Sequence, residues 1–196
     1  MKILGLCGGS GSGKGEVGAA FFSFSVPSVD TDKVYHEMTS ADSPCLRELS
    51  AAFGSEIISS DGALDRKVLR NIVFSDKERL GLLNEITHKH ILAKTRLMLK
   101  EYEMAGAELA IVDAPLLFES GFNRECDATV CVIADREVRI SRIMRRDGIE
   151  RADAVRRIDS QRSDGELTAL CDFCIENNGD IDTLRDKVKE LISKII

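Results

Sequence analysis

The sequence predicts an α/β protein in which helices cover both faces of a parallel sheet. Five short, apolar runs are separated by segments whose apolar residues recur with helical spacing. Short, nearly continuous apolar runs are typical of strands that are buried on both faces. The regular alternation of these strands with helices along the chain favours a three-layer, doubly wound arrangement. The five runs cover residues 3–7, 26–29, 109–112, 128–134 and 173–175.

The composition favours a single domain and excludes several classes of partner. The chain has 196 residues, of which 43% are apolar, enough for one substantial core. Its formal charge of −6 supplies no global field that would attract nucleic acid or an anionic membrane. No apolar run approaches the roughly 20 residues of a bilayer span, and the N-terminus enters a strand rather than a signal peptide. We therefore expect a soluble, cytoplasmic protein with neither a nucleic-acid nor a membrane partner.

The strand predicted at 2–7 leads into a glycine-rich loop that ends in a lysine. A helix is predicted to begin near Lys14, so strand, loop and helix follow in the order of a P-loop. In such a loop, backbone N–H groups and the helix N-terminus bind the β-phosphate of ATP, and the lysine reaches the β- and γ-phosphates. We therefore predict that Lys14 is catalytic. The predicted ATP-binding residues of this segment are Gly8, Gly9, Ser10, Gly11, Ser12, Gly13, Lys14, Gly15 and Glu16.

Position 15 departs from the P-loop pattern. The pattern has serine or threonine there, whose hydroxyl binds Mg²⁺, whereas this chain has Gly15 followed by Glu16. Mg²⁺ accepts several water ligands, so the phosphates and a water held by a nearby carboxylate can replace the hydroxyl. Asp113 ends the apolar run 109–112 as a Walker-B acid does. It is the predicted metal residue, acting through water, and Asp30 and Asp32 are further candidates.

Two aspartates follow the second apolar run, 26–29. In a parallel sheet, ligands bind at the carboxyl ends of the strands, where Asp30 and Asp32 are expected. A carboxylate there can accept the proton of an attacking hydroxyl, and we predict that Asp32 is this base. Asp30 is predicted to bind substrate, with the alternative that Asp30 or Thr31 only caps the next helix.

The connection between the second and third runs predicts a helical insertion. It contains roughly 80 residues, too many for one simple crossover, so 31–107 is interpreted as a substrate-binding insertion. Ser75 and Glu78 have the spacing of a capping box before a long helix, which Gly106 is suited to end. A last helix is predicted from an apolar stripe of Leu184, Val188, Leu191, Ile192 and Ile195.

Residues 135–162 are strongly basic, which indicates an anionic ligand in a protein of negative net charge. We interpret the segment as a helical lid whose arginines stabilise charge on a transferred phosphoryl group. Arg142 and Arg146 are four residues apart and share a helix face, so both are predicted to bind ATP and Arg142 to be catalytic. Arg139 and Arg145 are expected to be solvated. The alternative is a merely charged surface helix.

The six cysteines do not predict a disulfide framework. Cys171 and Cys174 form a CxxC pair, but a structural zinc site needs four ligands and usually a second such pair. Residues 171–175 alternate like a strand, so a structural role is preferred over metal or redox chemistry.

Several motifs are distributed along the chain, and two of them, the Pro115–Glu119 segment and the Asn-Asn-Gly near the C-terminus, are far more specific than the P-loop. The motifs are Gly5–Lys14, Val29–Lys33, Leu64–Arg66, Ile72–Phe74, Asp113–Gly121, Arg142–Gly148, Arg157–Gln161 and Asp172–Gly179. Through them the sequence resembles, along nearly its whole length, the dephospho-CoA kinase family, the last enzymes of coenzyme A synthesis.

The resemblance implies transfer of the ATP γ-phosphate to the ribose 3′-hydroxyl of dephospho-CoA, with Mg²⁺. It implies that Asp32 is the base and that lid arginines lie near ATP. The residues it places on the substrate side are Arg66, His88, Pro115, Leu116, Leu117, Phe118 and Glu119. His88 is followed by Lys89 where the family has proline, so a packed or solvated histidine is an alternative there, as a solvated charge is for Arg66.

We expect one P-loop kinase domain in three parts. They are a core (about 1–30, 108–134 and 163–196), the helical insertion (about 31–107) and the lid (about 135–162). Two other functions stay open. One is a different small-molecule P-loop kinase, of the nucleoside monophosphate or shikimate type. The other is a pseudo-kinase that binds ATP without turnover, suggested by Gly15.

Overall fold

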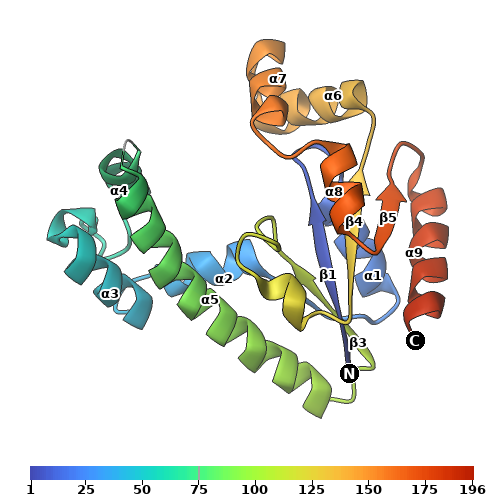
Figure 1. The fold of residues 1–196 in the computed structure, drawn as a ribbon, viewed down its shortest axis with the longest axis horizontal. Coiled ribbons are helices and arrows are strands. Elements are labelled where there is room, and N and C mark those ends of the chain that lie inside the picture. The colour runs from blue at the N-terminus through green and yellow to red at the C-terminus, as the bar shows by residue number, and fades with distance from the viewer. Residues whose placement is uncertain (75) are drawn as a thin grey trace. The chain divides into compact units, whose positions relative to one another are not determined.

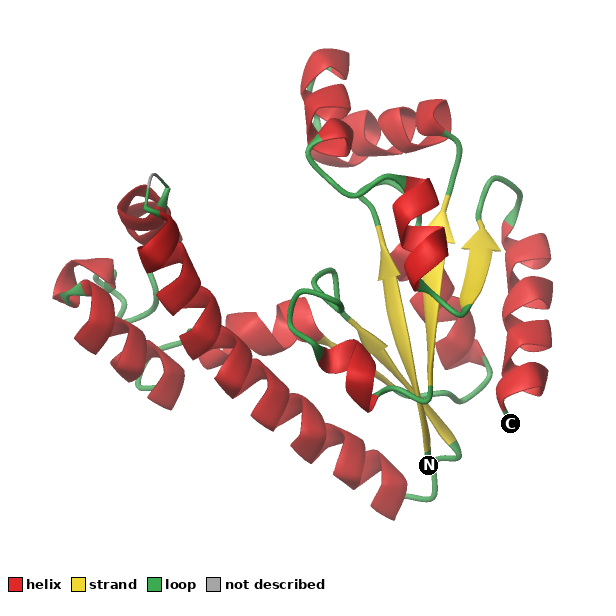
Figure 2. Ribbon diagram, in the orientation of Figure 1, coloured by secondary structure: helices red, strands yellow, loops and turns green. Residues whose placement is uncertain are grey.

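The structure is a computed structural model that describes residues 1–74 and 76–196. The chain divides into two compact units, each described here by itself. The core unit comprises residues 1–29 and 101–196, and the helical unit comprises residues 30–100. Figure 1 traces the elements along the chain, and Figure 2 distinguishes the strands from the surrounding helices.

A five-stranded sheet organises the core unit, in the order β2-β3-β1-β4-β5. The strands are β1 (Lys2–Gly8), β2 (Ser28–Asp30), β3 (Leu109–Asp113), β4 (Ala128–Ile133) and β5 (Phe173–Glu176). β1 pairs in parallel with both β3 and β4, and β4 pairs in parallel with β5. The predicted α/β class with a parallel sheet is thus confirmed. The second strand begins later than the predicted run, and Pro27 accepts a hydrogen bond from Ile111 through its carbonyl.

The main apolar core lies on one face of this sheet. α1 (Lys14–Ser23) contributes the fully buried Val17 and Phe21, and α9 (Ile181–Ile195) contributes Leu184 and Val188. They pack with alternate residues of the strands, since successive side chains of a strand point to opposite faces. α8 (Asp164–Leu170) packs against β4, in front of it in Figure 1.

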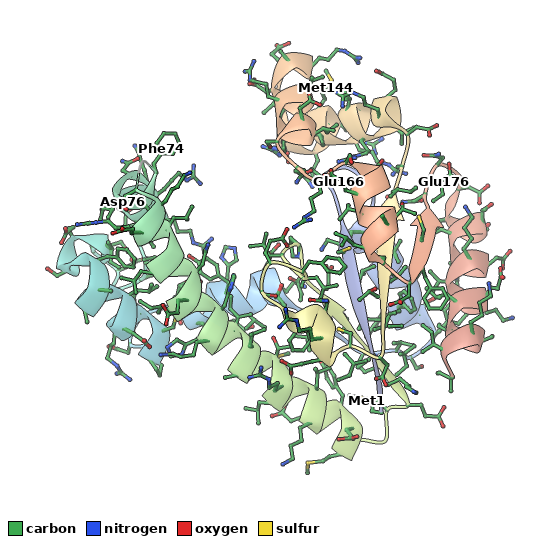
Figure 3. All side chains as sticks on the ribbon, viewed as in Figure 1. Met1, Phe74, Asp76, Met144, Glu166 and Glu176 are labelled. Carbon is green, nitrogen blue, oxygen red and sulfur yellow. The ribbon has the colours of Figure 1, made fainter. Side chains whose placement is uncertain are left out.

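Two further helices of the core unit, α6 (Arg136–Asp147) and α7 (Arg151–Asp159), form a small cluster of their own. Ile140, Ile143, Ala154 and Ile158 are buried between them, and Met144 packs at the side. Figure 3 shows this pair of helices around Met144 with its many polar side chains. The cluster explains how so basic a segment stays helical, because its apolar stripe has a partner.

The helical unit has a separate apolar core, which includes Leu46, Leu49, Ile57 and Leu69. Its elements are α2 (Thr31–Met38), α3 (Pro44–Phe53), the 3-10 turn η1 (Ser55–Ile57), α4 (Arg66–Val73) and the greater part of α5 (Lys77–Met104). The predicted helical character of this region is confirmed.

At the start of α5, the sequence predicts a capping box formed by Ser75 and Glu78. Ser75 lies outside the described residues. Asp76 Oδ1 accepts hydrogen bonds from the backbone N–H groups of Glu78 and Arg79, each at 3.0 Å, and so satisfies donors that a helix start leaves unpaired. α5 ends two residues before Gly106, whose φ of 86° is the left-handed conformation that suits glycine at a helix end. None of the described helices is long and apolar enough to cross a membrane.

Leu184→Ala should lower the free energy of unfolding by about 2–5 kcal/mol, because it leaves a cavity under the sheet where the side chain is 2% exposed. Ile181→Ala is the control in the same helix, since that side chain is 54% exposed and its truncation should cost within about 0.5 kcal/mol. Urea titration followed by circular dichroism measures both. Equal losses in the two variants would contradict the assigned packing of α9.

Candidate active site

The glycine-rich loop has the form that the sequence predicts. β1 ends at Gly8, and α1 begins at Lys14 behind Gly13, which has a left-handed backbone with φ of 88°. Gly11 is also left-handed, with φ of 78°, and the Ser12 N–H donates to the Gly9 carbonyl at 3.1 Å. Left-handed glycines within a tight turn allow a chain to curl around an anion at a helix N-terminus.

The glycines of this loop are not equivalent. A Cβ at Gly13 would lie 2.1 Å from Asn177 Nδ2, and a Cβ at Gly11 would lie 2.6 Å from the Arg139 carbonyl oxygen. A Cβ at Gly15 would meet no atom within 4 Å. Close packing therefore excludes a side chain at Gly11 and Gly13, whereas the missing hydroxyl at position 15 has no steric cause.

Lys14 forms an ion pair with Asp113, the last residue of β3. Both side chains are less than one-fifth exposed, so little water screens the pair. β1 and β3 are neighbours in the sheet, which brings the carboxylate to the end of the P-loop. The structure thus brings the predicted metal residue beside the predicted catalytic lysine.

Arg142 contacts the loop directly. Its Nη1 donates to the carbonyl oxygens of Gly11 and Ser12, at 3.3 and 3.2 Å. Nη2 lies 3.9 Å from a carboxylate oxygen of Glu16. The guanidinium therefore lies at the phosphate-binding loop, as the lid interpretation requires.

Arg146 is arranged differently from Arg142. Its guanidinium donates twice to the neighbouring Asp147, at 2.7 and 2.9 Å, and Arg157 donates to the same carboxylate. The hydrogen bonds from Arg146, and then those from Arg157, lower the pKa of Asp147 to about 2. The structure does not bring Arg146 to the P-loop.

The expectation that Arg139 is solvated is wrong. Arg139 is only 3% exposed, whereas Arg145 is exposed as expected. Arg139 Nε donates to the Ser10 carbonyl at 3.0 Å, and Nη1 donates to Asp164 at 2.7 Å. The missed signal is spacing: Arg139 lies three residues before Arg142, so the two share a helix face as surely as residues four apart do.

Two amides also contact the P-loop. Gln161 accepts from the Ser10 N–H at 2.8 Å and donates to Ser10 Oγ at 3.1 Å. The buried Asn177 donates to the Ser12 carbonyl and to Glu16, each at 3.0 Å. Both amides stand in motifs that carry the family resemblance, but neither was assigned to the site from the sequence.

The predicted substrate loop after β3 has a buried and an exposed part. Leu117 is completely buried against Gly5, so it holds the loop in place and has no exposed surface to offer a ligand. Pro115 and Leu116 are exposed, and Phe118 is half-buried. Glu119 accepts from Arg162 Nε at 2.8 Å.

The remaining predicted residues belong to the helical unit. Asp30 caps α2 by accepting from the N–H groups of Asp32 and Lys33, at 3.0 and 3.1 Å, as the capping alternative expects. The Asp32 side chain is exposed in the first turn of that helix. Arg66 lies over the Tyr35 ring, with its Nη1 2.9 Å from His36 Nε2.

His88 is half-buried within α5. Its neighbours in sequence meet Glu48 instead: Lys89 forms an ion pair with that carboxylate, and His90 Nε2 lies 2.7 Å from it. These bonds to Lys89 and His90 lower the pKa of Glu48.

The CxxC pair lies at the start of the last strand, where Cys174 is in β5 as the alternation predicts. Cys174 is in register with Cys131 and Cys131 with Cys7, and the Cys171 sulfur lies 3.5 Å from that of Cys7. Burial is the first cause that raises the pKa of Cys174 to about 11, so this thiol stays protonated at neutral pH. Over residues 1–74 and 76–196, no three His, Cys, Asp or Glu side chains are grouped to hold a metal ion.

Gly13→Ala should weaken ATP binding at least about tenfold, because a left-handed residue with a Cβ costs about 1–2 kcal/mol and the Cβ would strike Asn177. Gly15→Ala is the matched control, since its Cβ meets nothing and alanine stabilises a helix by about 0.5–1 kcal/mol relative to glycine. Calorimetric titration with ATP and thermal unfolding of both variants measure these effects. Equal affinity in the two variants would contradict the described loop.

Comparison with known proteins identifies the family. The model of the dephospho-CoA kinase family matches residues 2–183. A dephospho-CoA kinase of Corynebacterium glutamicum is 38% identical over 195 residues, covering all of both chains. A solved dephospho-CoA kinase from Campylobacter jejuni is 26% identical with a TM-score of 0.72, and a solved Thermus thermophilus protein, TT1252, is 31% identical with a TM-score of 0.83. Each covers all of this chain and 98% of its own. The chain therefore belongs to the dephospho-CoA kinase family.

Proposed function

We propose that this chain transfers the γ-phosphate of ATP to the ribose 3′-hydroxyl of dephospho-CoA, giving coenzyme A and ADP, with the residues of the candidate site in the roles given below. Family membership assigns the activity of an ATP-dependent dephospho-CoA kinase. The observation that carries the assignment of roles is the joining of the P-loop, Lys14, Asp113 and Arg142 in one unit.

ATP is bound by segment 8–16. The loop amides and the N-terminus of α1 attract the β-phosphate. Lys14 exchanges its bond with Asp113 for phosphate oxygens, which are stronger partners for a point charge at this position. Arg142 is proposed to bind the same oxygens, because its guanidinium already lies at the loop and donates to two of its carbonyls. Both cations then stabilise the negative charge that spreads over the transferred group.

Asp32 is the proposed base. Asp30 takes up the helix-capping role, and the Asp32 carboxylate is exposed in the first turn of α2. An exposed carboxylate can accept the proton of the 3′-hydroxyl as that oxygen attacks the γ-phosphorus. The proton moves to the Asp32 carboxylate, the bond between the γ-phosphorus and the bridging oxygen breaks, and ADP leaves.

Mg²⁺ is the proposed metal, and the residues of the core unit fit it in part. Asp113 supplies one carboxylate at the P-loop, while Gly15 supplies no oxygen. Because Mg²⁺ keeps several waters and binds through one or two carboxylates plus phosphates, Asp113 can hold it through water. When bound, the ion would neutralise phosphate charge.

The proposed dephospho-CoA side consists of Arg66, His88 and the exposed residues of loop 115–119. Arg66 supplies a cation that can bind phosphate, and Pro115, Leu116 and Phe118 supply apolar surface. The division into core, insertion and lid, and a cytoplasmic location, stay predictions.

A pseudo-kinase is the second candidate function, and Gly15 is the observation that favours it. A protein of that kind binds ATP without turnover. A coupled assay of ADP release with ATP, Mg²⁺ and dephospho-CoA separates the two: turnover supports the kinase. ATP binding without turnover, in both the native protein and Gly15→Ser, would leave only the pseudo-kinase.

Asp32→Asn should lower kcat about 10²–10⁴-fold, the usual contribution of a general base. The affinity for ATP should stay within twofold, because the amide keeps the shape of the side chain. Glu37→Gln, another exposed acid of α2, is the control and should retain full activity. A near-normal kcat for Asp32→Asn would remove Asp32 as the base.

Gly15→Ser should lower the Mg²⁺ concentration needed for half-maximal activity, because it restores the hydroxyl that P-loops place on the metal. A Cβ at this position would meet no atom within 4 Å. Asp113→Asn should raise the same concentration. Activity measured against Mg²⁺ at fixed ATP tests both, and an unchanged requirement in Asp113→Asn would exclude Asp113 as the metal residue.

A further inference from the structure

Arg139 is one of the most buried charged side chains of the protein, and the reaction proposed above does not use it. It lies in α6 and is 3% exposed. Each of its guanidinium nitrogens has a polar partner: Ser10 O at 3.0 Å, Asp164 Oδ1 at 2.7 Å and Gln161 Oε1 at 3.4 Å. Burial of a charge is costly unless it is paired and hydrogen-bonded, as this guanidinium is.

Arg139 and Gln161 together hold every polar atom of Ser10. Arg139 binds the Ser10 carbonyl, while Gln161 binds the Ser10 N–H at 2.8 Å and its hydroxyl at 3.1 Å. Gln161 lies in the connection between α7 and α8, and Asp164 is the first residue of α8. Ser10 is thereby tied to two parts of the chain that are remote from the P-loop in sequence.

The loop also packs closely against Arg139. A Cβ at Gly9 would lie 2.3 Å from Arg139 Nη2, and a Cβ at Gly11 would lie 2.6 Å from the Arg139 carbonyl oxygen. The glycines on both sides of Ser10 therefore leave room for this one residue. Arg139 thus packs directly against the backbone of residues 9–11.

Side-chain donors bind three successive carbonyl groups of the loop. Arg139 binds that of Ser10, Arg142 binds those of Gly11 and Ser12, and Asn177 also binds that of Ser12. A peptide unit is planar and trans, so its C=O and N–H point in opposite directions. A donor that holds the Ser10 carbonyl on one side of the loop therefore directs the following N–H, that of Gly11, to the opposite side, where the phosphates are proposed to bind. The Ser12 N–H, which follows the Gly11 carbonyl, is bonded within the loop to the Gly9 carbonyl instead.

We propose that Arg139, held by Asp164 and Gln161, is a positioning residue that orients the P-loop amides for the phosphates of ATP. Its charge is neutralised by Asp164 at 2.7 Å, so its effect is on loop conformation rather than on the electrostatic field at the phosphates. This distinguishes it from Lys14 and Arg142, whose charges are proposed to act on the phosphates.

Arg139→Gln tests the proposal. The variant keeps one polar head group but loses the ion pair and two of the three hydrogen bonds. The loss of hydrogen bonds to a charged group should disturb the loop conformation that binds phosphate. We therefore expect the Kd for ADP to rise about tenfold or more. The KM for dephospho-CoA at saturating ATP should stay within about twofold, a split that general loss of structure does not produce.

Arg136→Gln is the matched control. Arg136 is in the same helix and forms an ion pair of nearly the same length, 2.6 Å to Asp159, but both partners are half-exposed. Surface pairs contribute little, so its ADP affinity should be unchanged. Arg139→Lys should be intermediate, because one ammonium cannot reach all three acceptors.

Gln161→Met keeps the proposal testable if Arg139→Gln does not fold. It removes the amide that holds Ser10 but leaves the Arg139–Asp164 pair, and its Kd for ADP should rise several-fold with little change in melting temperature. The proposal is overturned if folded Arg139→Gln binds ADP within twofold of the native protein. It is equally overturned if Arg139→Gln is unfolded and Gln161→Met binds ADP normally.

Discussion

The fixed direction of the P-loop peptide groups is the constraint on which this active site depends. An anion-binding loop needs its N–H groups turned inward, although every peptide unit also carries a carbonyl that must then find a partner outside. Here the partners are side chains from α6 and from the end of β5, and they bind the carbonyls of residues 10–12. The loop is held by the elements around it as much as by its own glycines.

The glycine positions follow from that packing. Gly9, Gly11 and Gly13 each face a side chain or backbone atom that leaves no room for a Cβ. Gly15 faces open space, so steric packing does not require a glycine at this position. The loop is thus closely packed at Gly9, Gly11 and Gly13, whereas a Cβ at Gly15 would meet no atom within 4 Å.

The charged side chains at the P-loop are also held by specific partners. Although the net charge of the chain is negative, three cations lie at the P-loop. They are Lys14, the buried Arg139 and the half-buried Arg142. Each of these cations has an acidic partner, respectively Asp113, Asp164 and Glu16. Pairing keeps the cations in place, and two of the acids have different proposed roles. Asp113 is the proposed metal residue, whereas Asp164 holds Arg139, the proposed positioning residue.

The sequence by itself determined the sheet, the helices and the glycine-rich loop. Apolar periodicity and glycine spacing are local patterns, so they can be recognised without knowledge of tertiary contacts. The sequence also determined the family, through motifs spread over nearly the whole length. Only the tertiary structure decided which side chains meet the loop. Arg139 looks like any exposed arginine until α6 packs beside Ser10, and Leu117 looks like a ligand contact until it is buried against Gly5. Both outcomes depend on contacts between residues more than one hundred positions apart. The spacing of Arg139 and Arg142 indicates a shared helix face, but it does not show what that face contacts.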